Sequence, residues 1–286
     1  MNETKFANVF RSYLKCTFNL QIFIISLSRI RTDHLKARFN SDPAKWWNNF
    51  YKNNTANFFK DRKWLQQEFP VLSEITKPDA GPITVLEVGA GAGNTAFPIL
   101  AHNENPSLKI HACDFSKKAV EVIRANEVYD TKSIQADVWD AAGHELPEGL
   151  KEGSVDVVIM IFIFSALSPS QWDQCVQNIY KVLKPGGEVL FRDYGRGDLA
   201  QVRFKKGRYL EENFYIRGDG TRVYFFEKDE LVKIWTGANV EETTGEKQSN
   251  YFEVIDLGVD RRLLVNRAKQ LKMYRCWLQG RFQKPD

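Results

Sequence analysis

The residues best suited to bind a ligand are three glycines that alternate along one short stretch. The stretch Val85–Asn94 reads VLEVGAGAGN, so Gly89, Gly91 and Gly93 follow an apolar run that contains a single acid, Glu87. Glycine adopts left-handed backbone angles and lets the chain approach a ligand where a side chain would collide. The pattern predicts a strand that ends in a tight loop, with a ligand bound outside its carboxyl end. Taken alone, a plain strand-to-helix turn would also explain it.

Further candidate residues close the strands that we expect after this loop. Asp114 comes 25 positions after Gly89, where an acidic side chain can hydrogen-bond both hydroxyls of a ribose. Asp137 and Val138 end the third expected strand, and Ile161 ends the fourth. Because the carboxyl ends of parallel strands share one edge of a sheet, these side chains should gather around one ligand.

The glycine loop and the acid before it resemble motif I of class I methyltransferases. A dinucleotide fingerprint would carry its third glycine where this chain has Asn94. The resemblance implies S-adenosylmethionine as the cofactor. It also implies that Asp137 lies near the adenine amino group with Val138 beside it, and that Ile161 lines the adenine face.

The chain lacks the residues that two other methylation chemistries require. Carbon-5 of a pyrimidine is not nucleophilic until a cysteine adds to the ring, and no cysteine here follows a proline as it does in those enzymes. Methylation of an exocyclic amine usually accompanies a D/N-P-P-F/Y/W sequence after the fourth strand, where this chain reads IFIFSALSP. A ring nitrogen with an in-plane lone pair needs neither device. The absences favour a ring-nitrogen acceptor or a small-molecule acceptor.

The elements that must position these residues alternate between strand and helix patterns. Candidate strands are Ile83–Val88, Lys109–Cys113, Ser133–Ala136, Val155–Ile161 and Glu188–Phe191, and candidate helices are Thr95–His102, Lys117–Asn126 and Ser170–Leu183. This alternation predicts βαβ units and a parallel sheet, with the last helix stopped by the turn at Lys184–Gly187. Later strands around Val223–Phe226, Tyr251–Ile255 and Lys272–Phe282 suit an antiparallel finish at the sheet's edge.

The fold class that follows is α/β, a Rossmann-like class I methyltransferase with a mainly parallel sheet, an antiparallel C-terminal strand and an N-terminal helical, aromatic cap. Asp42 and Pro43 should start a helix of that cap. We expect residues 1–40 to be a poorly ordered extension, 41–80 a cap or RNA-binding segment, and 81–286 the methyltransferase domain.

Composition limits the partners of the chain. At 286 residues and 43% hydrophobic it can form one large domain, and its net charge of +4 is mild. Eight bases and one acid nevertheless lie between Arg261 and Asp286, and a second basic stretch runs from Arg192 to Arg222. Such clusters attract polyanions, although a charged run is more often a solvated face. The cysteines and histidines show no ligand spacing, so we expect no metal and a reducing compartment.

The N-terminal extension leaves the compartment open. Its apolar run Phe18–Leu27 is about half of the ~20 residues that a membrane span needs, and no cleavage signature follows it, so we expect no membrane segment. Its excess of bases keeps a mitochondrial transit peptide open, beside a poorly ordered tail or a wrongly assigned start. We expect a cytoplasmic protein, with the mitochondrion as the alternative.

Several longer stretches resemble the tRNA 3-methylcytosine methyltransferases, which modify cytosine 32 in the anticodon loop, and especially the fungal members. Coverage runs from about Asn40 to the C-terminus, and the specific elements are F-F-K-D-R and F-R-D-Y-G. One departure is Ala90, where many relatives carry cysteine. The matching stretches are Trp47–Lys52, Phe58–Arg62, Phe191–Gly195, Glu212–Tyr215, Asp219–Arg222, Tyr224–Phe226, Lys272–Arg275 and Gln279–Pro285, together with Trp277.

The resemblance implies roles for residues outside the glycine loop. Trp47 and Tyr51 would cover the cofactor, although aromatics at helical spacing also suit a core. Arg62 and Asp193 would contact a flipped cytosine, with Asp193 accepting from the amine and offsetting the product's positive charge. Phe59 would stack on the base. The alternative for Asp193 is a salt bridge with a neighbouring arginine.

The same resemblance implies tRNA as the partner, with threonine or serine acceptors, and in some relatives a cognate aminoacyl-tRNA synthetase such as the seryl enzyme. Two alternatives stay open: a small-molecule methyltransferase of the same fold, and a non-catalytic binding subunit. Phosphate contacts are expected from Arg192, Arg203, Lys206, Arg217, Arg222 and Arg275.

Overall fold

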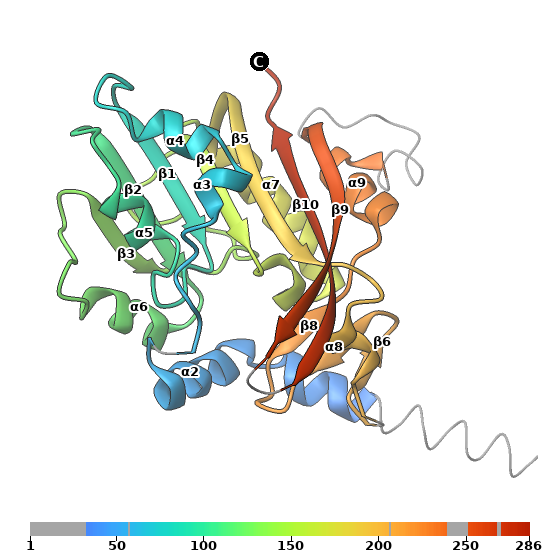
Figure 1. Cartoon of the computed structure of the whole chain (residues 1–286). Coiled ribbons are helices and arrows are strands. Elements are labelled where there is room, and N and C mark those ends of the chain that lie inside the picture. The colour runs from blue at the N-terminus through green and yellow to red at the C-terminus, as the bar shows by residue number, and fades with distance from the viewer. Residues whose placement is uncertain (1–32, 57, 206, 239–250, 268–269) are drawn as a thin grey trace, which may run out of the picture.

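The centre of the structure is one mixed sheet of seven strands. The computed structural model describes residues 33–286 except 57, 206, 239–250 and 268–269. The strand order is β3-β2-β1-β4-β5-β10-β9; the first five strands run parallel, and β10 and β9 are antiparallel additions at one edge (Figure 1). The predicted sheet is therefore confirmed. The strands are β1 (Ile83–Val88), β2 (Leu108–Asp114), β3 (Ile134–Val138), β4 (Val155–Ile161), β5 (Leu183–Tyr194), β9 (Glu253–Asn266) and β10 (Leu271–Gln283).

Helices cover both faces of the sheet because its strands send apolar side chains alternately to two sides. From β1, Leu86 and Val88 join one core, and Val85 joins the other. The first core is covered by α7 (Trp172–Val182) and α9 (Lys228–Thr236), and the second by α3 (Leu65–Glu68), α4 (Val71–Ile75), α5 (Ala96–Ala101) and α6 (Lys117–Arg124).

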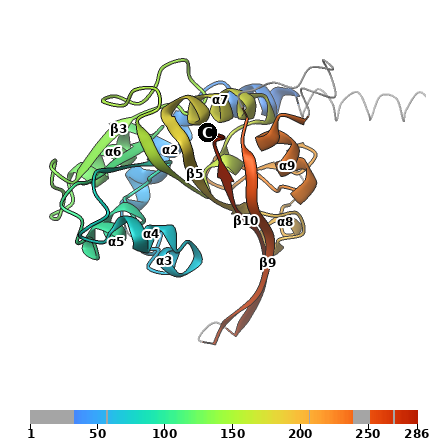
Figure 2. The same cartoon turned by 90° about the horizontal axis from the view of Figure 1, so that it is seen from above.

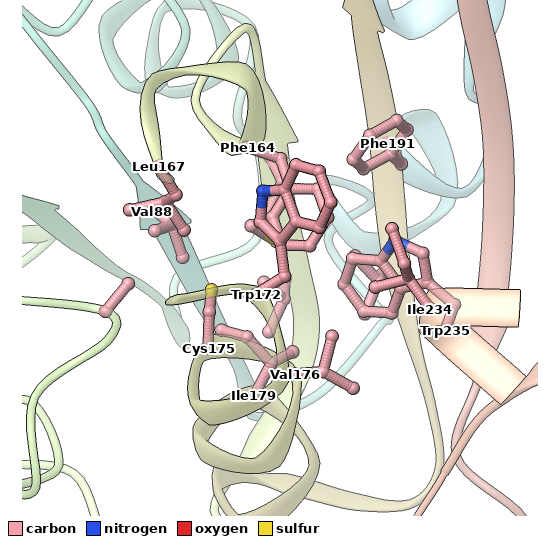
Figure 3. Close-up of a cluster of buried hydrophobic side chains, with 14 of the residues drawn as sticks. Val88, Phe164, Leu167, Trp172, Cys175, Val176, Ile179, Phe191, Ile234 and Trp235 are labelled. Carbon is pink, nitrogen blue, oxygen red and sulfur yellow. The ribbon is translucent and has the colours of Figure 1, made fainter. Parts of the chain in front are cut away.

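The larger core is built around aromatic rings. Trp172, at the start of α7, stacks on Phe164 with ring centroids 5.9 Å apart (Figure 3). Trp235 of α9 stacks on Phe282 of β10 at 4.6 Å. Burying one such side chain stabilises a fold by roughly 1.5–3 kcal/mol. This core therefore anchors the loop after β4, where Phe164 begins the short helix η1 (Phe164–Ala166), and the end of β10.

An N-terminal cap precedes the sheet. Its main helix is α2 (Pro43–Asn54), and the Asp42 carboxylate accepts a hydrogen bond from the Lys45 amide at 3.0 Å. Pro43 takes the first helical position, where its missing amide is not needed. The predicted start of the helix is confirmed.

The boundary of the N-terminal extension needs a correction. Residues 33–40 form a helix, and Phe39 buries its ring against Trp46 of α2 at a centroid distance of 4.9 Å. The expectation of a poorly ordered extension is wrong for residues 33–40 because this contact holds them on the cap. Residues 1–32 lie outside the described part of the chain.

Strands β9 and β10 form a ribbon that extends beyond the sheet. β10 pairs with β5 only from Trp277 to Gln283, whereas it pairs with β9 from Leu271 onwards. The distal half of the ribbon projects from the body of the molecule (Figure 2). Side chains there are exposed, including Val265 at 53% and Tyr274 at 65%.

Two further expectations change in the C-terminal half. The strand around Val223–Phe226 does not join the main sheet: β8 (Arg222–Tyr224) pairs in a separate sheet with β7 (Phe214–Ile216) and β6 (Tyr209–Glu211). A short helix, α8 (Leu199–Val202), precedes that sheet.

The turn at Lys184–Gly187 ends α7 as predicted but lies inside β5. Leu183 already pairs with Val155 of β4, and the register then shifts so that Val157 pairs with Glu188. The turn is a bulge within a strand rather than a loop between elements.

Candidate active site

The loop after β1 forms a backbone cradle at the point where the sheet changes winding direction. The chain runs outwards through β2 and β3 and returns to β4 beside β1, so the carboxyl ends of β1 and β4 border one crevice. Gly89 and Gly91 have φ angles of 67° and 61° and line a cavity of about 510 Å³. A Cβ on Gly89 would lie 2.7 Å from Ile163, and one on Gly91 would lie 2.4 Å from the Tyr51 hydroxyl. Gly93 turns the chain behind the cavity lining.

Asp114 holds this loop from the end of β2. Its Oδ2 accepts a hydrogen bond from the Gly91 amide at 2.9 Å, and its Oδ1 accepts one from the Ser116 amide at 2.7 Å. Burial raises the pKa of this carboxyl to about 6, against the opposing effect of both backbone hydrogen bonds. The group lines the cavity and keeps free lone pairs for further donors such as ribose hydroxyls.

Arg62 and Glu87 form a buried ion pair behind the loop. Nη1 of Arg62 lies 3.6 Å from Oε1 of Glu87 and donates to the Thr95 hydroxyl at 2.7 Å. The Arg62 amide donates to the carbonyl of Asn94 at 2.8 Å. Burial lowers the pKa of Arg62 and raises that of Glu87 to about 7. Arg62 lines the cavity and joins the cap to the glycine loop, whereas Glu87 lies behind it.

Aromatic side chains of the cap form one wall of the cavity. Trp47 and Tyr51 both line it, with their rings stacked at a centroid distance of 6.2 Å. Phe59 lines it too and packs on Phe50 at 5.7 Å. Trp47, Tyr51 and Phe59 thus lie where they could contact a ligand in the cavity, and their roles stay predictions.

The expected adenine contacts are only partly at the cavity. Ile161 lines it. Asp137 does not: it is buried, accepts from Arg124 at 2.7 Å and is outside the lining. Val138 is 53% exposed and also outside the lining. Neither residue lines the cavity, because the chain continues past β3 before it reaches it, and their contact with adenine stays a prediction. The residues that line it there are Trp139, Asp140 and Ala141.

Asp193 lies beneath the cavity rather than on its surface. It is fully buried, its Oδ2 accepts from the Ser165 amide at 2.8 Å, and its Oδ1 accepts from the Tyr194 amide at 2.8 Å. Burial raises the pKa of this carboxyl to about 6. Asp193 is absent from the residues that line the cavity, so its expected contact with an acceptor base stays a prediction. The alternative of a salt bridge is wrong, since Arg192 and Arg196 pair with other acids.

Two arginines expected to bind phosphate are structural. Arg192 is 2% exposed, donates to Asp260 and Gln279, and lies between the rings of Trp64 and Trp277 at 5.0 and 4.6 Å. A guanidinium enclosed in this way cannot reach a phosphate at the surface. Its pKa is lowered by burial.

Arg222 is likewise buried, at 4% exposed, although it borders the cavity. It donates to the Ala166 carbonyl at 3.1 Å, to Asn40 at 2.9 Å and to Gln171 at 3.0 Å. These bonds join β8 to the loop after β4 and to the cap, and burial lowers its pKa to about 10. The expectation of a surface phosphate contact is therefore wrong for Arg222.

The remaining predicted phosphate contacts are accessible or lie outside the description. Arg203 is exposed, and Arg217 and Arg275 are half-buried and line the cavity. Lys206 lies outside the described residues. The structure thus brings Arg217 and Arg275 to the same cavity as the glycine loop.

Three aromatic residues at the cavity were not predicted from the sequence. They are Phe162, directly after β4, Tyr194, at the end of β5, and Trp277, in the middle of β10. Phe162 follows the predicted strand directly, and Tyr194 lies in the F-R-D-Y-G stretch, so both signals were present in the sequence.

The residues present fit an adenosyl cofactor. The cavity volume lies within the ~300–1,000 Å³ usual for small-molecule sites. The cradle at Gly89 and Gly91 is one that a Cβ would fill, and Asp114 presents a buried carboxylate beside it. Apolar faces from Ile161, Ala141 and Trp139 suit a purine.

Neither a metal centre nor a membrane span is found in the described residues. Within that part of the chain, no group of His, Cys, Asp or Glu side chains could hold a metal ion. None of the helices in the same residues combines the length and apolarity needed to cross a bilayer.

A doubly wound parallel sheet with this glycine cradle defines the class I methyltransferase fold. A methyltransferase domain family matches residues 86–189. A SAM-dependent methyltransferase from Anabaena variabilis matches with a TM-score of 0.56 at 12% identity, over 84% of this chain and 94% of that chain. One from Methanosarcina mazei matches with a TM-score of 0.52 at 18% identity, over 76% and 98%.

Sequence relatives define the family more narrowly. The tRNA(Thr) (cytosine(32)-N(3))-methyltransferase of Saccharomyces cerevisiae is 55% identical over 88% of this chain, and the match spans 38% of that protein's length. The tRNA N(3)-methylcytidine methyltransferase of Schizosaccharomyces pombe is 51% identical over 87% of this chain and 77% of its own length. A Drosophila melanogaster relative with the same description is 44% identical over 87% and 74%. The chain belongs to the tRNA N(3)-methylcytidine methyltransferase family.

Proposed function

We propose that the chain transfers the methyl group of S-adenosylmethionine to ring nitrogen 3 of cytosine 32 in the anticodon loop of threonine or serine tRNAs. The observation that carries the proposal is the shared cavity: the glycine cradle with Asp114 lines one part of it, and Arg217 and Arg275 line another. A donor held at the cradle therefore faces the side from which a polyanionic substrate can enter. The family of the chain supplies the substrate class.

The proposed reaction depends on the alignment of the acceptor nitrogen with the methyl group rather than on proton transfer. Bound adenosylmethionine supplies a methyl group on a positively charged sulfur. Ring nitrogen 3 would take that methyl group through its lone pair, S-adenosylhomocysteine would leave, and the base would then carry the positive charge. Because no proton has to leave first, the protein needs no general base. This agrees with a cavity whose acids are held by the backbone, as Asp114 is.

The residues of this chain bind, orient and exclude water. Gly89 and Gly91 leave room for the cofactor to approach the backbone of the loop. The Asp114 carboxylate accepts a hydrogen bond from the ribose of the cofactor. Trp47 and Tyr51 close over it from the cap, which shields the reacting atoms. Arg62 keeps that cap attached to the loop.

The direct test uses threonine and serine tRNA transcripts incubated with purified protein and adenosylmethionine carrying a deuterated methyl group. Mass spectrometry of anticodon-loop fragments should find the label in 3-methylcytidine at position 32 alone. A transcript with uridine at position 32 is the matched control and should stay unlabelled. Label at another nucleoside, or none in any tRNA under conditions where cofactor binds, would refute the proposal.

We further propose that the seryl-tRNA synthetase acts as an accessory partner that stimulates methylation of serine tRNAs. Adding the synthetase should raise the rate on serine tRNA and leave threonine tRNA unchanged. An equal rate with and without the synthetase would exclude it as a partner.

We also propose that the protein acts in the cytoplasm. A fluorescent fusion that co-localises with mitochondria would favour the mitochondrion instead.

A further inference from the structure

Three aromatic rings from separate strands form a continuous wall of the cavity. Phe162 after β4 packs on Tyr194 at the end of β5 with ring centroids 4.9 Å apart, and on Trp277 of β10 at 6.2 Å. Tyr194 and Trp277 are direct partners in the antiparallel pairing of β5 with β10. All three are half-buried and line the cavity, so part of each ring faces it. We call these three residues the aromatic wall.

The backbone at the wall is strained. Phe162 has a φ of 61°, in the left-handed region that a bulky side chain rarely adopts. Its amide donates to the Arg192 carbonyl at 2.8 Å, which holds that conformation. Strain of this kind costs about 1–3 kcal/mol and persists where the surrounding structure imposes it, often at ligand sites. The next residue, Ile163, packs against Gly89 of the cradle, so the wall adjoins the cofactor position.

Two guanidinium groups border the wall. Arg275 lies over Tyr194 at 5.8 Å and over Trp277 at 5.0 Å, and Arg217 lies over Tyr194 at 5.4 Å. The Nε of Arg275 donates a hydrogen bond to the Asp198 carboxylate at 2.8 Å. Each guanidinium has five N–H donors, of which the protein bonds engage only some, so donors remain for a ligand.

The wall is also supported from behind. The buried guanidinium of Arg192 lies 4.6 Å from the Trp277 ring centre and is fixed by Asp260 of β9. The Trp277 indole N–H is buried and has no hydrogen-bond partner among the described residues. A buried unpaired donor costs free energy that a ligand acceptor would recover.

We propose that the aromatic wall of Phe162, Tyr194 and Trp277 is the subsite for the flipped acceptor cytosine, with Arg217 and Arg275 donating to its carbonyl oxygen. This inference rests on the proposed function and names the part of the cavity that takes the base. A pyrimidine has a π-face that stacks on such rings, and loop bases are cheap to unstack. Donors at the carbonyl leave ring nitrogen 3 free for attack. The proposal thus assigns the base to the aromatic wall rather than to Phe59 and Asp193.

Photo-crosslinking tests the placement without depending on catalysis. The full chain with S-adenosylhomocysteine is mixed with a threonine tRNA that carries 5-iodocytosine at position 32, irradiated, digested and sequenced by mass spectrometry. The cross-link should fall on Phe162, Tyr194 or Trp277. A tRNA with 5-iodocytosine in the acceptor stem is the control and should not cross-link there. A cross-link from position 32 to Phe59, Trp47 or a site outside the cavity would overturn the inference.

Two substitutions test the energetic role. Tyr194→Leu and Trp277→Leu remove the aromatic face and should lower kcat/KM for tRNA about 10- to 100-fold, while affinity for S-adenosylhomocysteine changes little. Tyr209→Leu is the matched control, because this tyrosine of β6 is 50% exposed and lines no part of the cavity. It should keep wild-type kcat/KM.

The outcomes separate the two proposals. If wild-type protein methylates cytosine 32 but both substitutions keep full activity, the subsite is wrong and the function stands. If wild-type protein methylates no tRNA, the proposed function fails and the subsite fails with it. If a substituted chain loses cofactor affinity as well, the cross-link position decides between a base contact and a purely structural role.

Discussion

Three buried carboxyl groups around the cavity are easier to protonate than ordinary acids. Burial is the first cause in each case, and it raises the pKa of Glu87 to about 7 and those of Asp114 and Asp193 to about 6. Each accepts at least one backbone hydrogen bond, which opposes the shift without cancelling it. The site therefore keeps carboxyl groups in place mainly as hydrogen-bond acceptors for the backbone.

The titration of Glu87 gives a prediction about stability. Its folded pKa lies above the ordinary 4.5, so its contribution is present at low pH and is lost as pH rises towards about 7. Glu87→Gln removes the ionisable group, so the variant does not lose this stability as the pH rises. The free energy of unfolding of the variant relative to wild type should rise by on the order of 3 kcal/mol across that window and then level off. Urea unfolding of both proteins over the pH range measures it, with exposed Glu127→Gln as the control. Parallel curves would contradict the assigned pKa.

The glycine cradle gives a second prediction at the residue scale. Gly89→Ala should weaken binding of S-adenosylhomocysteine at least about tenfold in calorimetry, because φ is 67° and the added Cβ would meet Ile163 at 2.7 Å. Gly153→Ala is matched in backbone, with φ of 61° and nothing within 4 Å of the added Cβ. It should cost about 1 kcal/mol of stability and leave affinity unchanged. Equal affinities in both variants would mean that the cradle does not hold the cofactor.

Among the elements, the parallel strands were predictable because they are buried on both faces. The bounds of β4 match the apolar run Val155–Ile161, and β1 matches Ile83–Val88. β9 was predicted to end at Ile255 but continues to Asn266, because the projecting ribbon is exposed on both faces and carries no apolar alternation. The bulge in β5 was not predictable, because Pro185 and two glycines indicate a turn whether it lies between two elements or inside one strand.

The site was predictable where backbone chemistry alone selects the residue, as at Gly89 and Gly91. It was not predictable where the outcome depends on which way a side chain turns. Asp137 and Asp193 both end strands and both carry carboxylates, yet each turns to other partners of the fold. A single sequence shows the charge but not the depth at which tertiary packing places it. For the same reason, Arg192 and Arg222 looked like surface bases.

Arg222 and Arg203 provide a prediction at the scale of elements. Arg222→Ala should destabilise the fold by about 2–4 kcal/mol, because it leaves the buried Ala166 carbonyl without this donor and removes the bonds to the half-buried Asn40 and Gln171. Arg203→Ala, on the exposed end of α8, should change stability by less than about 0.5 kcal/mol. Chemical unfolding separates the two. In tRNA binding at low salt, Arg203→Ala should weaken affinity a few-fold. An unaltered stability for Arg222→Ala would show that its hydrogen bonds are not structural.

On the scale of the whole molecule, the N-terminal cap and the C-terminal ribbon both line the cavity at the edge of the sheet. The cap contributes Trp47, Tyr51 and Arg62, and the C-terminal ribbon contributes Arg275 and Trp277. Glu68 of α3 accepts from Arg262 of β9 at 2.7 Å and from Gln279 of β10 at 3.0 Å, which joins the cap segment to the ribbon. The ribbon then continues away from the body (Figure 2). Its distal bases Arg261, Arg267 and Lys272 do not line the cavity.

This arrangement predicts a salt-dependent contribution from the ribbon alone. Replacing Arg261, Arg267 and Lys272 with Gln should weaken tRNA binding and reduce the slope of log affinity against log salt by about 2 to 3, since each phosphate that the protein no longer neutralises keeps roughly one counterion. Affinity for S-adenosylhomocysteine should not change. The charge-matched control replaces Lys77, Lys132 and Lys151, exposed bases away from the ribbon, and should keep the wild-type slope. Filter binding over a salt series measures both. If the two triple variants reduce the slope equally, the attraction is set by net charge, and the ribbon has no specific role in holding RNA.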